Sequence, residues 1–91
     1  IYPAEVEQVL ITHPTVTDVA AIAWPHPEVG ENIAAFVVPT KKIDEQVLIE
    51  YCLKELAPFK TPKRIFFIEE MPKTALGKVV KADLVAKLPD A

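Results

Sequence analysis

Hydrophobic and polar positions follow two different periods along the chain and divide it into six segments. Apolar residues recur at helical spacing in three of them, from Pro3 to His13, from Asp44 to Pro58 and from Val80 to Leu88. Nearly continuous apolar runs of strand length fill the other three, residues 16–24, 32–38 and 65–68. The first pattern predicts helices with one buried face, and the second predicts strands covered on both faces. The order α-β-β-α-β-α predicts an α+β fold with a small three-stranded sheet, mixed or antiparallel, flanked by helices.

Residues that start helices or turn the chain support these boundaries. Pro3 suits the first position of a helix, and acidic residues follow it in the first turns. Asp44 has the side chain of a helix N-cap. Residues 25–31 contain two prolines and a glycine and predict a loop that is too long for a tight hairpin. We therefore expect an open loop between the first two strands.

The composition is that of a folded globular chain. Of the 91 residues, 51% are hydrophobic and 25% are charged, which argues against disorder and fits one domain, residues 1–91. No apolar run approaches the length of a membrane span, and no stretch resembles a signal peptide. The chain opens at Ile1 rather than at a methionine, in residues that already predict a helix start. We therefore expect it to be part of a longer protein.

Cysteine and histidine usage points away from disulfide and metal chemistry. The only cysteine, Cys52, falls at a core position of the second helix and is expected to be a buried, inert thiol. This fits a reducing, cytoplasmic setting. His13 and His26 have no Cys, His or carboxylate partner at ligand spacing, so no metal site is expected.

Charge is distributed unevenly along the chain. Residues 1–57 carry three basic and nine acidic side chains, a net charge of −6, whereas residues 58–87 carry seven basic and three acidic ones, a net charge of +4. A basic segment on an acidic domain suggests a localised anionic ligand, although lysines spread over unrelated solvated faces give the same count. No set of stacking aromatics lies among these lysines, so a nucleic-acid surface is not expected.

The strongest chemical signal is a glycine–lysine pair that follows a proline. Gly77, one of only two glycines, stands immediately before Lys78 in a stretch that begins at Pro72. Glycine permits a positive φ or a close backbone approach to a ligand, and the lysine adds a compact charge suited to phosphate or carboxylate. The spacing is not that of a P-loop, which needs a glycine where Pro72 stands and a serine or threonine where Val79 stands.

The longer string from Glu69 to Lys81 reads EEMPKTALGKVVK. It closely resembles the C-terminal signature of the adenylate-forming enzymes, which include acyl- and aryl-CoA synthetases, luciferases and the adenylation domains of peptide synthetases. In that family a proline, a basic residue, a threonine, two variable residues and a glycine precede an invariant catalytic lysine. The resemblance therefore implies that Lys78 is the catalytic lysine and that Thr74 and Gly77 belong to the loop that meets substrate or nucleotide.

Three further segments resemble the same family. Residues 2–14 are similar to the first helix of its C-terminal domain. Residues 25–31 and 58–64 resemble segments that lie near CoA in the CoA ligases of the family. The resemblance implies five CoA-binding candidates, Gly30, Glu31, Phe59, Lys60 and Lys63. Residues 58–64 also fit a turn with solvated lysines, because the same segment occurs in family members that use no CoA.

The resemblance implies the C-terminal lid domain of an ATP-dependent acid–CoA ligase. In such ligases the acid and ATP form an acyl-adenylate with release of pyrophosphate, and CoA then displaces AMP to give the thioester. Lys78 serves the first step, and ATP, Mg²⁺ and the carboxylic acid are bound mainly by a large N-terminal domain that is absent from this chain. Catalytic lysines of such synthetases are sometimes acetylated, so a lysine acetyltransferase and a deacetylase that act on Lys78 are expected partners.

Other functions also fit the residues. Within the family, the chain would suit a peptide-synthetase adenylation domain, which passes the acyl group to a carrier protein, or, less closely, a luciferase-like oxidase. Outside it, a small α+β module would hold an anionic ligand on basic loops without chemistry. As a lid domain, the 91-residue chain by itself is expected to fold without catalysing.

Overall fold

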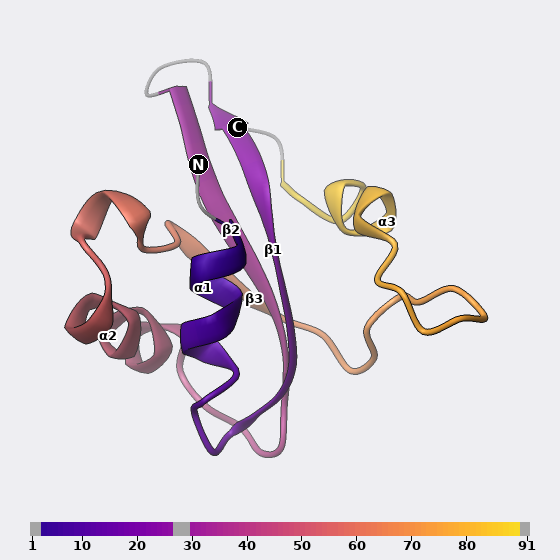
Figure 1. Ribbon diagram of the computed structural model, residues 1–91, viewed down its shortest axis with the longest axis horizontal. Helices are drawn as coiled ribbons and strands as arrows, with labels where there is room; N and C mark the ends of the chain where they lie inside the picture. The colour runs from indigo at the N-terminus through magenta and orange to yellow at the C-terminus, as the bar shows by residue number, and fades with distance from the viewer. Residues whose placement is uncertain (1–2, 27–29, 90–91) are drawn as a thin grey trace.

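The computed structural model describes residues 3–26 and 30–89, and Figure 1 shows them as one sheet between two layers. In chain order the elements are α1 (Pro3–Leu10), β1 (Val16–His26), β2 (Gly30–Pro39), α2 (Glu45–Glu55), the short 3₁₀ turn η1 (Pro58–Lys60), β3 (Arg64–Phe67) and α3 (Lys81–Val85). The central strand β2 is antiparallel to β1 and parallel to β3. The predicted α+β class, the element order and the three-stranded sheet are confirmed, and of the two sheet types that the sequence left open the structure shows the mixed one.

The connection between β1 and β2 is shorter than the sequence predicted. Both strands extend into the segment rich in proline and glycine, where Pro25 pairs with Glu31 and His26 pairs with Gly30. The prediction of an open loop over residues 25–31 is therefore wrong; residues 27–29, which remain between the strands, lie outside the described residues. Proline is tolerated because β1 is an edge strand, where a missing backbone N–H need not interrupt the sheet.

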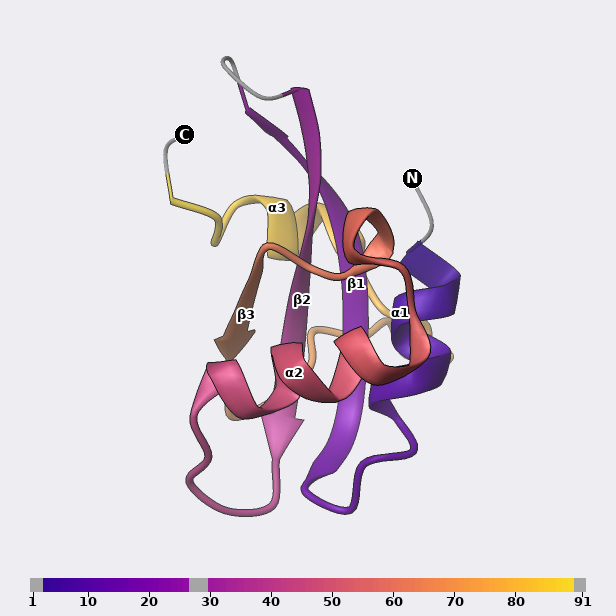
Figure 2. The same cartoon turned by 90° about the vertical axis from the view of Figure 1, so that its left-hand side faces the viewer.

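Both faces of the sheet are covered, which accounts for the unbroken apolar runs in its strands. Figure 1 and Figure 2 show α1 and α2 on one face and α3 on the other. Successive residues of a strand point to opposite faces. In β1, Val19 and Ala21 accordingly belong to the core beneath α1 and α2, while Ala20 and Ile22 belong to the core beneath α3.

Helix α2 begins where the sequence predicted. Asp44 caps it, because its carboxylate accepts a hydrogen bond from the backbone N–H of Gln46 at 3.0 Å. Cys52 on its inner face is fully buried, and burial raises the pKa of the thiol to about 11, so the thiol stays protonated at neutral pH. The predicted buried thiol is confirmed. This helix has 11 residues, and no helix in the described part of the chain has the length and apolar content of a membrane span.

Helix α3 is shorter than predicted. It ends at Val85, whereas the apolar pattern continues to Leu88. The following residues form turns, and Leu88 still packs against the core on that face. Pro89 sets the outer limit at Leu88, because a proline disfavours helical backbone in the residue before it, and the helix ends three residues before that limit. Strand β3 begins and ends one residue earlier than predicted.

Candidate functional site

Lys78 lies in a small hairpin between β3 and α3, drawn in orange in Figure 1, where it projects away from the sheet. Lys73 and Val79 form an antiparallel bridge at its base. The backbone of Thr74 bonds across the turn in both directions. Its N–H donates to the carbonyl of Lys78 at 2.8 Å, and its carbonyl accepts from the N–H of Gly77 at 2.9 Å. The signature segment is therefore a closed turn rather than an irregular loop.

Gly77 supplies the backbone conformation that this turn requires. Its φ is +88°, and no residue other than glycine in the described part of the chain has a positive φ. Ala75 and Leu76 have negative φ, and the N–H of Gly77 bonds to the carbonyl of Thr74. Residues 74–77 therefore match a type I turn that ends in a left-handed glycine. Of the two uses of glycine that the sequence suggested, the structure shows the positive φ.

The Thr74 hydroxyl makes a second set of bonds within the turn. Its Oγ1 accepts hydrogen bonds from the N–H of Leu76 at 3.3 Å and from the N–H of Lys78 at 3.2 Å. Short side chains with an oxygen often fix turns through such local bonds. Thr74 therefore holds the backbone on both sides of Gly77.

The Lys78 side chain is exposed and forms no ion pair within residues 3–26 and 30–89. The lysines that flank the hairpin differ in this respect. Lys73 Nζ lies 2.7 Å from Asp18 Oδ2, and Lys81 Nζ lies 3.4 Å from Glu7 Oε2. These pairs neutralise the charge at the base of the hairpin and leave the Lys78 ammonium open to an external anion.

Glu7 and Lys81 also fasten the end of the hairpin to the sheet. Glu7 Oε2 accepts from the backbone N–H of Ala21 at 2.8 Å, and Lys81 Nζ donates to the carbonyl of Ala21 at 3.1 Å. The ion pair of Glu7 and Lys81 thus binds both the N–H and the carbonyl of Ala21 in the edge strand β1. This contact protects the strand edge and fixes the point at which the hairpin joins α3.

The ion pairs give a second explanation of the uneven charge distribution along the chain. Four of the seven basic residues in segment 58–87 pair with acids from residues 1–57; the pairs are Lys60–Glu5, Arg64–Glu45, Lys73–Asp18 and Lys81–Glu7. Much of the basic excess therefore complements the acidic part of the same domain instead of forming one anion-binding patch.

The segment predicted to contact CoA lies across the sheet from the hairpin. In Figure 1, η1 lies on the side of α1 and α2. Phe59 is 74% exposed, and Lys60 lies 5.8 Å from the centre of its ring and 3.3 Å from Glu5 Oε2. Lys63 follows on the same segment and is also exposed. Phe59, Lys60 and Lys63 therefore form one local group, and the structure separates them from Lys78.

The other two CoA candidates lie in the sheet. Gly30 and Glu31 open β2, where their backbones pair with β1. The side chain of Glu31 lies outside what the structure describes. Contact of these two residues with CoA stays a prediction, now for the end of a strand pair instead of an open loop.

Arg64, next to the predicted CoA segment, joins β3 to α2. Its Nε lies 3.0 Å from Glu45 Oε2, and the same oxygen accepts from the N–H of Ile65 at 2.9 Å. Burial would raise the pKa of the Glu45 carboxyl, but the hydrogen bonds from Arg64 and Ile65 and the Arg64 charge hold that pKa below its usual value. The ion pair therefore has a structural role between two elements.

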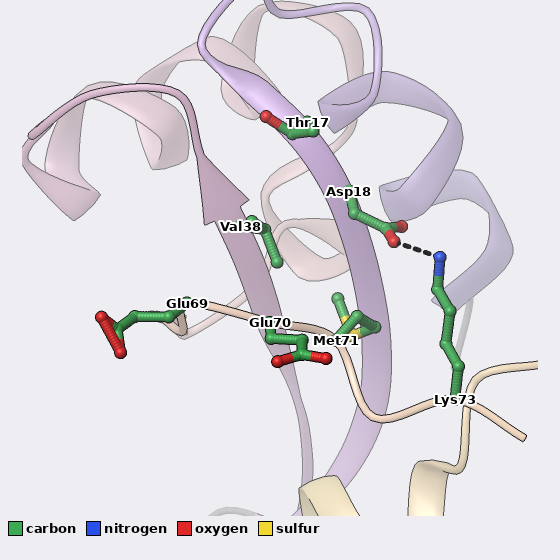
Figure 3. Close-up of a pocket in the computed structure, with 7 residues that line it drawn as sticks. All are labelled: Thr17, Asp18, Val38, Glu69, Glu70, Met71 and Lys73. Carbon is green, nitrogen blue, oxygen red and sulfur yellow. Dashed lines mark ion pairs between the residues drawn. The ribbon is translucent and has the colours of Figure 1, made fainter.

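Sequence reasoning missed a cleft beside the hairpin, which Figure 3 shows. Its volume is about 410 Å³, and its lining residues are Thr17, Asp18, Val38, Glu69, Glu70, Met71 and Lys73. Three carboxylates outnumber one lysine, whose charge Asp18 neutralises, so the cleft is unsuited to a phosphate group. In the described part of the chain, no three His, Cys, Asp or Glu side chains are arranged to hold a metal ion. The adjacent glutamates were visible in the sequence, whereas the approach of Asp18 depends on the fold.

Comparison with known proteins supplies the family. The family model for the AMP-binding enzyme C-terminal domain matches residues 5–78, from α1 to the lysine at the hairpin. The chain belongs to this family. The resemblance inferred from the sequence is therefore confirmed.

Relatives of this AMP-binding enzyme C-terminal domain include CoA ligases. The peroxisomal trans-cinnamate:CoA ligase of Petunia hybrida is 48% identical over 82 residues, which cover 88% of this chain and 14% of the ligase. The fatty acyl CoA synthetase of Mycobacterium tuberculosis matches 97% of this chain and 18% of its own, with a TM-score of 0.88 and 41% identity. ATP-bound MatB of Rhodopseudomonas palustris matches 96% of this chain and 18% of its own, with a TM-score of 0.88 and 34% identity.

The chain thus spans less than a fifth of the length of these relatives. These matches establish the family and the fold of the chain. AMP-binding enzyme C-terminal domains of this kind occur in acid–CoA ligases. The acids and the nucleotide in the names of the relatives are substrates or ligands of those proteins and are not thereby assigned to this chain.

Proposed function

We propose that the chain is the lid domain of an ATP-dependent acid–CoA ligase, in which it supplies Lys78 for acyl-adenylate formation and part of the CoA channel for thioester formation. A larger N-terminal domain of the same protein is its partner and binds most of the acid, ATP and Mg²⁺. The observation that supports this role best is the state of Lys78. Its ammonium is exposed and makes no ion pair with the described residues, while Lys73 and Lys81 beside it are neutralised.

The first half-reaction brings two anions together. A carboxylate oxygen attacks the α-phosphorus of ATP, the bond from that phosphorus to the bridging oxygen breaks, and pyrophosphate leaves. A fixed ammonium offsets the repulsion and stabilises the charge that develops on oxygen. Two unit charges 4 Å apart interact by roughly 4 kcal/mol at an effective dielectric constant of 20. This is the contribution expected of Lys78.

The second half-reaction uses the other face of the domain. The CoA thiol attacks the acyl carbon of the adenylate, and AMP leaves. Phe59, Lys60 and Lys63 are the candidates for contacts with CoA, together with Gly30 and Glu31 in β2. Because Lys78 lies across the sheet from η1, a rotation of the domain as one body would present each set in turn, as mobile lids do between reaction steps.

The test substitutes Lys78 in the full-length protein and measures the half-reactions separately. We expect Lys78→Ala to slow acid-dependent ATP–pyrophosphate exchange by on the order of 10²–10³-fold. Thioester formation from supplied acyl-adenylate and CoA should continue. Lys78→Arg should also be slow, because a guanidinium lacks the compact head of an ammonium. Lys87→Ala is the matched control, since Lys87 is likewise exposed and forms no ion pair with the described residues.

Three other outcomes would contradict the proposal. If both half-reactions survive in Lys78→Ala, Lys78 is a surface lysine. If both fail together, the hairpin serves the fold or both steps, and the division between faces is wrong. If only the affinity for an anion changes, the chain is a binding module.

Use of a carrier protein instead of CoA as the acceptor would favour a peptide synthetase. The cytoplasmic setting and acetylation of Lys78 stay predictions.

A further inference from the structure

We infer that Thr74 is a positioning residue for Lys78, acting through the backbone of the hairpin rather than by contact with the substrate. The inference rests on the proposed role of Lys78 in adenylation. It gives Thr74 a more specific role than membership of a loop that meets substrate or nucleotide.

The acceptor capacity of the Thr74 hydroxyl is already used within the turn. A hydroxyl oxygen has two acceptor lone pairs. The oxygen of Thr74 accepts from two backbone N–H groups, those of Leu76 at 3.3 Å and Lys78 at 3.2 Å. Its acceptor function is therefore directed at the protein and not at a ligand.

The bond to Lys78 restrains the backbone next to Gly77. Lys78 follows Gly77, which has more backbone freedom than any other residue type. The peptide that joins them carries the N–H bound by the Thr74 hydroxyl. The carbonyl of Lys78 is bound by the N–H of the same threonine at 2.8 Å. Both backbone groups that flank the Lys78 Cα are thus held by Thr74, which sets the direction in which the side chain leaves the turn.

The base of the hairpin is held by other contacts. The N–H of Val80 donates to the carbonyl of Pro72 at 2.9 Å, and Lys73 pairs with Asp18. Because these contacts fix the two arms, removal of the Thr74 hydroxyl should loosen the tip and leave the base in place. The effect should therefore fall on the direction of the Lys78 side chain rather than on folding of the domain.

The test compares Thr74→Val and Thr74→Ser in the full-length protein. Valine keeps the branched shape and lacks the hydroxyl, whereas serine keeps the hydroxyl. We expect Thr74→Val to lower kcat for acid-dependent pyrophosphate exchange by about tenfold, the effect of losing two ordinary hydrogen bonds, with KM for ATP and acid unchanged within about twofold. Thr74→Ser should restore most of kcat. Thioester formation from supplied acyl-adenylate should be unaffected.

Two controls separate the local effect from a general one. Thr40→Val makes the same chemical change at an exposed threonine after β2 whose hydroxyl makes no hydrogen bond with the described residues, and it should leave kcat unchanged. Amide hydrogen exchange reports on the turn without reference to catalysis. The N–H groups of Leu76 and Lys78 should exchange several-fold faster in Thr74→Val than in Thr74→Ser, because only valine leaves them without the hydroxyl acceptor.

The other outcomes overturn the inference in distinguishable ways. A higher KM for ATP or acid with an unchanged kcat would make Thr74 a substrate contact. A fully active Thr74→Val protein beside an inactive Lys78→Ala protein would remove the role of Thr74 and leave that of Lys78 intact. If Lys78→Ala itself leaves pyrophosphate exchange unchanged, the proposed function fails, and the positioning role of Thr74 falls with it.

Discussion

Gly77 carries the backbone conformation on which the presentation of Lys78 depends. Its φ of +88° costs a residue with a Cβ about 1–2 kcal/mol, and asparagine less than most. A Cβ at this position would meet no atom within 4 Å, so a substitution here changes backbone energy without a clash. We expect pyrophosphate exchange by the full-length protein to fall in the order wild type, Gly77→Asn, Gly77→Ala, with alanine up to about tenfold slower. Equal rates for all three would show that the left-handed turn is not needed for catalysis.

The spacing of residues in the sequence predicted the functional residues of the hairpin, but it did not predict the contacts that hold the hairpin against the sheet. Lys78, Thr74 and Gly77 are close in sequence, so their pattern was readable. Lys81 meets Glu7 and Ala21, which come from the other end of the chain, and no local pattern encodes such a contact. For the same reason the charge count suggested one ligand site where the structure has several separate ion pairs.

Charged side chains from the helices bind the backbone of one residue in each edge strand of the sheet. In β1, Ala21 is bound by Glu7 of α1 and Lys81 of α3. In β3, the N–H of Ile65 is bound by Glu45 of α2. The unpaired backbone groups of an edge strand can pair with a strand of another chain, and charged side chains at the edge commonly prevent such pairing. These contacts also join each edge strand to the helix layer, which favours movement of the domain as one body.

Glu45 makes the contact between α2 and β3 depend on pH. Burial opposes ionisation of its carboxyl, but bonds from Arg64 and Ile65 hold its pKa below the usual 4.5. Because the pKa is lower in the folded state, the contact stabilises the fold above about pH 4.5, and the stabilisation is lost as the pH falls through the folded value. We expect Glu45→Gln to lower the free energy of unfolding by up to about 1 kcal/mol at pH 7 and by much less at about pH 3.

Urea unfolding at several pH values measures this difference. Glu50→Gln is the matched control, because Glu50 lies on the same helix, is exposed and forms no ion pair with the described residues. The control should show no pH-dependent difference from the parent. A difference for Glu45→Gln that stays constant from pH 7 to pH 3 would mean that its ionised carboxylate does not stabilise the contact.

For the molecule as a whole, hydrophobic periodicity predicted the elements and the coverage of both sheet faces, but local turn signals misled at residues 25–31. The prolines and the glycine there suggested a loop, and the position of β1 at the sheet edge allowed the strand to continue. The choice between a mixed and an antiparallel sheet stayed open in the sequence. The helix between β2 and β3 resolves it, because a helical crossover joins parallel strands. Assignment of Lys78 and η1 to opposite faces follows only from the assembled fold.

The domain has the features of an independent folding unit. Its radius of gyration is 12.4 Å, against about 12 Å for a compact chain of this length, and each sheet face has its own core. We expect the isolated 91-residue chain to unfold in one cooperative urea transition and to show no acid-dependent pyrophosphate exchange. Exchange by the isolated chain would place the acid and ATP sites on this domain and overturn the lid proposal. Loss of cooperative unfolding would show instead that its fold depends on the larger domain, although helices already cover both faces of its sheet.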